Sequence, residues 1–245
     1  MKTCTKFSRR LGGASLVVVL LVLASVPVAA CGQEGQANEK QRRIKALIES
    51  LASPNKPPPD DRKGGYRIPP DYDRRAQQRI HDVCKAIVKE GFDAFPELVS
   101  HADDRRYCCT MEGMSSQENF SVGEMCWHLL EHQIAVYDND LQWLGRFRPG
   151  CLPGRESLAK WWEKRKGFTL LQLQIEATEN VLEQTKRVST ETLRRFRDAG
   201  VDVDIQKAKN VAQLEELLTR LKAADAPIRT TGICSRAWRM TGLPK

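Results

Sequence analysis

The chain lacks the short motifs of the common nucleotide-binding and hydrolytic sites. It contains no G-x-x-x-x-G-K-S/T, no G-x-G-x-x-G and no G-x-S-x-G, so neither a phosphate-binding loop nor a nucleophile elbow is indicated. Its eight cysteines include no C-x-x-C pair, which argues against a thioredoxin-like redox motif and a zinc ribbon. The absence of these motifs therefore argues against enzymes that use a phosphate-binding loop, a nucleophile elbow or a thioredoxin-like redox site.

The chain also lacks a strong charge of one sign once its N-terminus is set apart. Residues 1–30 hold four basic side chains and no acidic one, so the net charge falls from +8 for all 245 residues to +4 for the remaining 215. A remainder of mixed sign is an ordinary solvated surface, and no nucleic-acid partner is predicted from it. A length of 215 residues suits one domain with appendages.

What is present at the N-terminus is an export signal. Basic residues precede the apolar run "LVVVLLVLASVPVAA", which ends in small residues directly before Cys31. The "VAAC" at positions 28–31 resembles the lipobox of bacterial lipoproteins. This resemblance implies a signal peptide over residues 1–30, acylation of Cys31 with palmitate among the fatty acids, and anchoring in the lipid bilayer at the extracytoplasmic face. Gly32 in place of Asp implies the outer membrane if the cell envelope is Gram-negative.

Two other fates of this segment stay open. Ordinary signal peptidase can cut after Ala30, which would release a soluble secreted protein. The apolar run can also remain as an uncleaved anchor, although its glycines and Pro27 make it a poor membrane span.

Six cysteines remain after the signal and the lipid-attachment site are removed. An even set in an oxidising compartment favours structural disulfides, with buried free thiols as the main alternative. We expect at least one disulfide, and Cys108 or Cys109 can reach Cys126 if "CCTMEGMSSQENF" is a loop. The candidates are Cys84, Cys108, Cys109, Cys126, Cys151 and Cys234.

Residues 31–72 are predicted to form a lipid-anchored tether. A short amphipathic helix over residues 37–52 is followed by residues 53–73, which hold six of the twelve prolines. Such a stretch is typical of a semi-rigid spacer. The helical domain is then expected over residues 73–245.

The rest of the chain is predicted to be all-α, either an irregular helical bundle or a short HEAT-like array. A helix is predicted from about Asp73 to Gly91, and Ser121 with Glu124 forms a capping box before another. Further helices are expected over residues 155–166, 169–186 and 190–200, and another with its leucine stripe over residues 214–221. The longest strand candidate is "IRTTGIC".

Residues 86–107, "AIVKEGFDAFPELVSHADDRRY", resemble one HEAT-type helical repeat. A glycine turn, a proline-started second helix and an acidic–basic corner carry the resemblance, at Gly91, Ala94, Pro96, Leu98, Asp103 and Arg106. "LAKWWEKRKGFTLLQLQ" is similar to a segment of uncharacterised exported bacterial proteins with HEAT-like helices. The resemblance implies a stacked helical scaffold and supplies no activity.

The heptapeptide "CWHLLEH" places His128, Glu131 and His132 in the H-x-x-E-H spacing of one class of zinc peptidases. On a helical wheel, however, these residues fall opposite the apolar face of Met125, Leu129 and Leu130, where a packed helix meets solvent. We therefore predict that they bind no catalytic zinc. Five tryptophans, of which Trp161 and Trp162 are adjacent, are similarly interpreted as packing residues rather than as a binding platform.

These observations favour a membrane-tethered, extracytoplasmic helical scaffold or protein-binding module without catalytic residues or cofactors. Its expected partners are the lipid bilayer, through acylated Cys31, and a further protein. The alternative is a zinc-dependent hydrolase that uses His128, Glu131 and His132. A purely structural envelope protein is the third possibility, which the sequence does not separate from the first.

Overall fold

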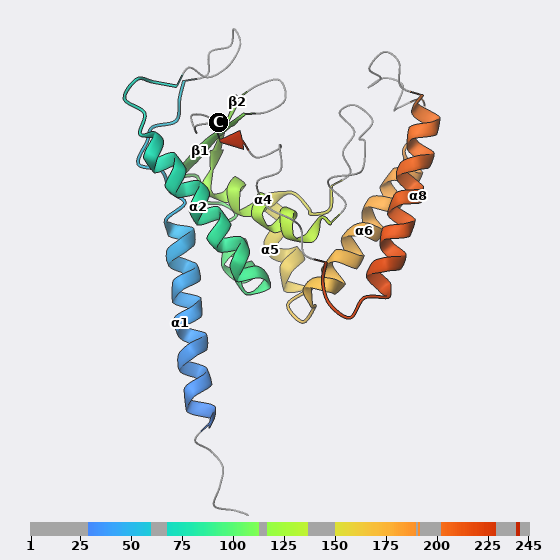
Figure 1. Cartoon of the computed structure of the whole chain (residues 1–245), viewed down its shortest axis with the longest axis horizontal. Helices are drawn as coiled ribbons and strands as arrows, with labels where there is room; N and C mark the ends of the chain where they lie inside the picture. Colours follow the sequence, from blue (N-terminus) through green and yellow to red (C-terminus); the bar gives the residue numbers. More distant parts are fainter. Residues whose placement is uncertain are drawn as a thin grey trace, which may run out of the picture. The chain divides into compact units, whose positions relative to one another are not determined.

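The computed structural model describes residues 29–59, 68–112, 117–136, 150–189, 191, 202–228 and 239–240 (Figure 1). Side chains are described from Gln36 onward, except those of residues 111, 112, 117, 239 and 240. The described residues are mainly α-helical, which confirms the all-α prediction in part, because a small sheet is also present. The helices are α1 (Ala29–Glu49), α2 (Arg74–Glu90), α3 (Phe95–Ser100), α4 (Val122–Ile134), α5 (Arg155–Glu163), α6 (Leu170–Arg187) and α8 (Val203–Lys222), with a 3-10 turn η1 (Gly91–Ala94). No helix in these ranges is both long and apolar enough to cross a membrane.

Several predictions fall outside the described residues. They concern the signal segment up to residue 28, the side chain of Cys31, the strand candidate beyond its first residue, Ile228, and most of the helix over 190–200. Cys234, Trp143 and Trp238 lie outside them as well.

A small antiparallel sheet occupies the segment that the sequence pattern indicates as a loop. Strands β1 (Tyr107–Glu112) and β2 (Gln117–Ser121) form a hairpin, and β3 (Arg239–Met240) pairs on the other side of β1, in the order β2-β1-β3. A register irregularity between Tyr107 and Cys109 leaves Cys108 and Cys109 both fully buried. This bulge breaks the two-residue alternation by which strands are recognised, so the sequence pattern does not reveal β1.

The hydrophobic core is organised around α4. This helix packs against α2, α3, α5, α6, β1 and β2. Its side chains Met125, Cys126, Leu129, Leu130 and Ile134 have no exposed surface. The predicted capping box starts the helix: Ser121 Oγ accepts from the backbone N–H of Glu124, and the Glu124 carboxylate accepts from the backbone N–H of Ser121.

The predicted helix pair before the sheet is present as α2, η1 and α3. The turn between them starts at Gly91, whose φ of 65° lies in the left-handed region that glycine adopts without steric cost. Pro96 lies in the first turn of α3, where the missing N–H costs no helical hydrogen bond.

Farther along the chain, α6 and α8 pack side by side (Figure 1). Ala177 of α6 and Leu214 of α8 are buried. On α6, Leu182 is also buried, whereas Leu171 and Ile175 are half-buried.

The compact domain begins earlier than the predicted boundary at residue 73. Gln41–Lys245 forms one compact unit, and Ile44, Ile48 and Leu51 are fully buried in its core. Arg43 also forms a two-pronged ion pair with Glu90 of α2, at 2.8 and 3.1 Å. The second half of α1 is therefore part of the domain rather than part of a separate tether.

Both described ends of the proline-rich segment are attached to the same domain. Asn55 donates to the carbonyl of Asp73 at 3.0 Å and accepts from its N–H at 2.8 Å. The buried Pro58 accepts a hydrogen bond from Asn119 of β2 at 2.9 Å. The described part of this segment is thus packed on the domain, which differs from the predicted spacer.

Replacing Ile48 by alanine tests the role of α1. We expect the free energy of unfolding to fall by about 2–5 kcal/mol, because a fully buried side chain is truncated. Urea denaturation of the mature chain measures the change. The exposed neighbour Lys45 provides the control, since Lys45→Ala should change stability by less than about 0.5 kcal/mol. Equal, small effects of both substitutions would contradict the placement of α1 in the core.

Candidate binding pocket

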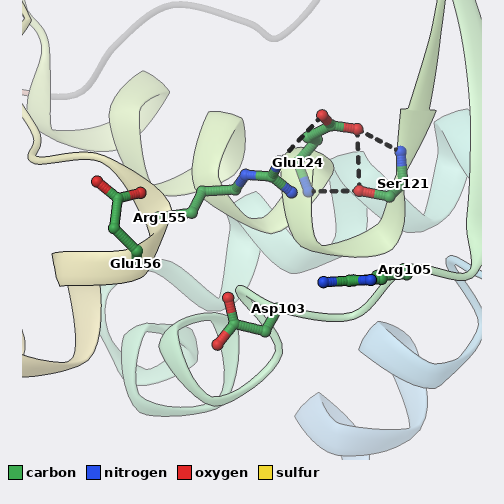
Figure 2. Close-up of a pocket in the computed structure, with 6 residues that line it drawn as sticks. All are labelled: Asp103, Arg105, Ser121, Glu124, Arg155 and Glu156. Carbon is green, nitrogen blue, oxygen red and sulfur yellow. Dashed lines mark hydrogen bonds and ion pairs between the residues drawn. The ribbon is translucent and has the colours of Figure 1, made fainter.

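A charged pocket of about 870 Å³ lies where three segments of the domain meet (Figure 2). The loop after α3 contributes Asp103 and Arg105. The start of α4 contributes Ser121, its N-cap, and Glu124, and the start of α5 contributes Arg155 and Glu156. The described lining residues are all polar or charged, so they offer a bound molecule charge and hydrogen bonding.

Two backbone hydrogen bonds hold the loop against the first turn of α4. The N–H of Val122 donates to the carbonyl of Arg106 at 2.8 Å, and the N–H of Gly123 donates to the carbonyl of Asp104 at 2.9 Å. A Cβ at Gly123 would overlap the carbonyl of Ala102, so only glycine permits this close approach. Arg105 therefore extends from a backbone that is fixed on both sides.

The four charged residues of this loop have two different roles: Asp104 and Arg106 form an ion pair, and Asp103 and Arg105 line the pocket. Arg106 binds Asp104 through Nη2 at 2.6 Å and Glu49 of α1 through Nη1 at 2.9 Å. The hydrogen bonds from the Arg106 guanidinium lower the pKa of the Asp104 carboxyl. Asp103 and Arg105 line the pocket instead. Of the two corner residues that carry the HEAT resemblance, Arg106 thus pairs with Asp104, whereas Asp103 lines the pocket.

Glu124 joins the starts of the two helices. One carboxylate oxygen, Oε2, accepts from the backbone N–H and the hydroxyl of Ser121, at 2.8 and 2.9 Å. The other, Oε1, lies 3.3 Å from Nη2 of Arg155. Arg155 occupies the first position of α5, where the helix dipole disfavours a cation, and Glu124 offsets that cost.

The first turn of α4 offers no spare N–H group to a ligand. The N–H groups of Val122, Gly123 and Glu124 are all used, by the two loop carbonyls and by Ser121 Oγ. The side chains of Asp103, Arg105 and Glu156, in contrast, are exposed and have no ion-pair or hydrogen-bond partner among the described residues. These three charges are available to a bound molecule.

The sequence pattern does not identify this pocket. The sequence pattern singles out Asp103 only as part of the HEAT-like acidic–basic corner. Arg105, Arg155 and Glu156 belong to no motif. One local signal is present: Arg155 follows Gly154 at a helix start, a position that favours acidic residues and side-chain caps. The convergence itself depends on residues about 50 positions apart and has no local pattern.

His128, Glu131 and His132 lie on α4 and do not line the pocket. Nδ1 of His128 is 3.6 Å from Oε2 of Glu131, and its ring lies against Phe120 and Trp127 with centroids 5.2 Å apart. The expectation that this face meets solvent is wrong in part, because α4 is covered on most sides: the Glu131 side chain is only 13% exposed.

Within the described residues, no three His, Cys, Asp or Glu side chains are placed to hold a metal ion. It remains a prediction that no catalytic zinc is bound by His128, Glu131 and His132.

Among the residues whose side chains the structure describes, the cysteines are buried free thiols. They are Cys84, Cys108, Cys109, Cys126 and Cys151. The expected link from Cys126 to Cys108 or Cys109 is not formed, and β1 rather than a loop carries the latter two. Burial raises the pKa of Cys126 to about 12. A buried, protonated thiol is a poor nucleophile, so Cys126 acts here as a core residue.

The described tryptophans pack in or against the core, in agreement with their interpretation as packing residues. Trp162 is 6% exposed and contacts the rings of Phe92 and Phe95. Trp127 and Trp161 pack against the same core, and Trp127 donates its indole N–H to the carbonyl of Pro153 at 2.9 Å.

The ion pair beneath the pocket loop predicts a pH-dependent stability. Because Arg106 lowers the pKa of Asp104 below its ordinary value of 3.8, this pair stabilises the fold above that pH, and the contribution is lost as the pH falls through the folded-state pKa. Asp104→Asn should lower the free energy of unfolding at neutral pH by about 1 kcal/mol, a modest figure because Arg106 is half exposed.

The difference between Asp104→Asn and wild type should shrink in acid. Urea denaturation at several pH values measures it. Asp103→Asn is the matched control, since this neighbouring carboxylate has no partner among the described residues and should affect stability little at any pH. A wild-type–variant difference that stays constant down to low pH would contradict the assignment.

Comparison with known proteins returns no match: no family model, no curated protein and no solved structure matches this chain.

Proposed function

We propose that the protein is a membrane-tethered, extracytoplasmic binding module that contacts a protein partner at the charged pocket. The observation that carries the proposal is Arg105, an exposed cation without a described partner at the edge of a concave site. Its chain neighbours Asp104 and Arg106 accept backbone hydrogen bonds from the first turn of α4, which fixes the backbone on both sides of it. A side chain on a fixed backbone loses less conformational freedom when it binds, which favours recognition. A concave site also favours a binding role over a purely structural one.

The tether in this proposal is lipid on Cys31. The basic residues, the apolar run and "VAAC" support acylation there. Two or three acyl chains on one cysteine provide the stable anchoring that a single chain does not. The envelope location, in the outer membrane if the cell is Gram-negative, follows from the same signal.

The scaffold in this proposal is a short HEAT-like helical array of which α2, η1 and α3 are one unit. The turn at Gly91 and the proline-started α3 support this assignment. In such arrays, the loops between helices often lie on one face and serve as the binding face. The loop that carries Asp103 and Arg105 directly follows α3.

Metabolic labelling with palmitate tests the tether. The wild-type protein should incorporate label, and Cys31→Ser should abolish it because the acceptor thiol is removed. Cys4→Ser is the matched control: it lies within the predicted signal, and its labelling should equal that of wild type. A Cys31→Ser protein that still incorporates palmitate would show that the anchor is elsewhere or absent.

Site-specific photo-cross-linking in cells tests the binding role. A photo-reactive amino acid at the exposed Ser157, next to the pocket residue Glu156, should yield one discrete cross-linked species. The same species should disappear when Arg105→Glu is added. A probe at the exposed Glu216 of α8 should not yield it. The proposal fails if Ser157 yields no adduct, or if its adduct is insensitive to Arg105→Glu.

A further inference from the structure

The lining of the pocket indicates how its occupant is recognised. Pockets for small molecules are mostly apolar, with a few polar groups that set orientation. Among the described residues, this pocket is lined by two arginines, three carboxylates and a serine. Such a lining resembles the polar contact areas of protein–protein interfaces, where arginine is enriched.

The lining charges are not equally available. Ser121 and Glu124 bind each other in the capping box, and Glu124 also holds Arg155. Arg105 is the cation that the described structure leaves open, and Asp103 and Glu156 are the open anions. Side chains of both signs without a described partner therefore line the same pocket, and Figure 2 labels them.

This arrangement disfavours an occupant of a single charge sign. A purely anionic group that approached Arg105 and Arg155 would also approach Asp103 and Glu156. A purely cationic group that approached the two acids would meet the arginines. Juxtaposed like charges are a means by which an interface rejects wrong partners. An occupant with an acidic group beside a basic one can satisfy both sets.

We infer that the pocket selects a peptide segment of the partner that carries an acidic and a basic side chain close together, and that Arg105 determines specificity by binding the acidic one. The guanidinium is always charged and presents a planar fork of donors that matches a carboxylate. Asp103 and Glu156 bind the basic side chain. This inference rests on the proposed function, because it names the chemistry of the partner at the same site.

The expected affinity is sensitive to salt. The lining is exposed and charged, so attraction between the pocket and the segment is screened as ionic strength rises. Binding should weaken strongly between low salt and about 0.5 M salt. An apolar occupant would not show this loss.

Fluorescence anisotropy with synthetic peptides tests the inference on the full mature chain in non-ionic detergent. The probes are labelled Gly/Ser peptides that carry one lysine and one aspartate at varied separations, together with two-aspartate and two-lysine peptides. The best mixed-sign peptide should bind at least about tenfold more tightly than either single-sign peptide at low salt.

Variants locate this binding at the pocket. Arg105→Glu should weaken the mixed-sign peptide by about tenfold or more, and Arg105→Gln, which removes the charge without reversing it, should weaken it less. Arg220→Glu is the matched control, because this exposed arginine of α8 undergoes the same charge reversal away from the pocket lining. It should leave the affinity unchanged.

Two outcomes would overturn the inference. Either a single-sign peptide binds as tightly as every mixed-sign peptide, or no mixed-sign peptide binds in an Arg105-dependent way. Neither outcome removes the proposed function, which fails instead if the Arg105-dependent cross-link from Ser157 is absent. The two results therefore separate an error in the ligand chemistry from an error in the site.

Discussion

The contact between the loop after α3 and the first turn of α4 is the constraint on which the site depends. Two backbone hydrogen bonds join these segments, and Gly123 permits them because no side chain separates the two backbones. They satisfy N–H groups that every helix start leaves unpaired. The same bonds place Arg105 beside the cavity. One local interaction thus completes a helix and positions a candidate recognition residue.

Charge is distributed around this contact in two roles. Asp104, Arg106 and Glu49 form an ion-pair network that joins the loop to α1, whereas Asp103 and Arg105 line the pocket. Alternate residues of one short loop therefore serve the fold and the site. The capping glutamate of α4 has a similar double role, because it completes the capping box and holds the arginine at the start of α5. Stability and recognition are coupled here through shared residues, so substitutions at Glu124 would affect both.

The central position of α4 explains why some surface predictions failed. A helix that packs against one neighbour has one buried stripe, which a helical wheel locates correctly. Among the described elements, α4 packs against four helices and two strands, so residues opposite its main apolar face, such as Glu131 and the C-cap Ala135, are covered as well. The bulge at Cys108 is a comparable case, since it turns two consecutive side chains into the core and removes the strand pattern.

The sequence by itself determined the features that depend on nearby residues: the predominance of helix, the capping box of Ser121 and Glu124, and the turn at Gly91. Each follows from hydrogen bonds or steric limits within a few positions of the chain. Only the tertiary structure decided that α1 belongs to the domain and that Arg105, Glu124 and Arg155 surround one cavity. These residues come from segments far apart in the sequence, and their proximity results from how the helices pack, which no local pattern records.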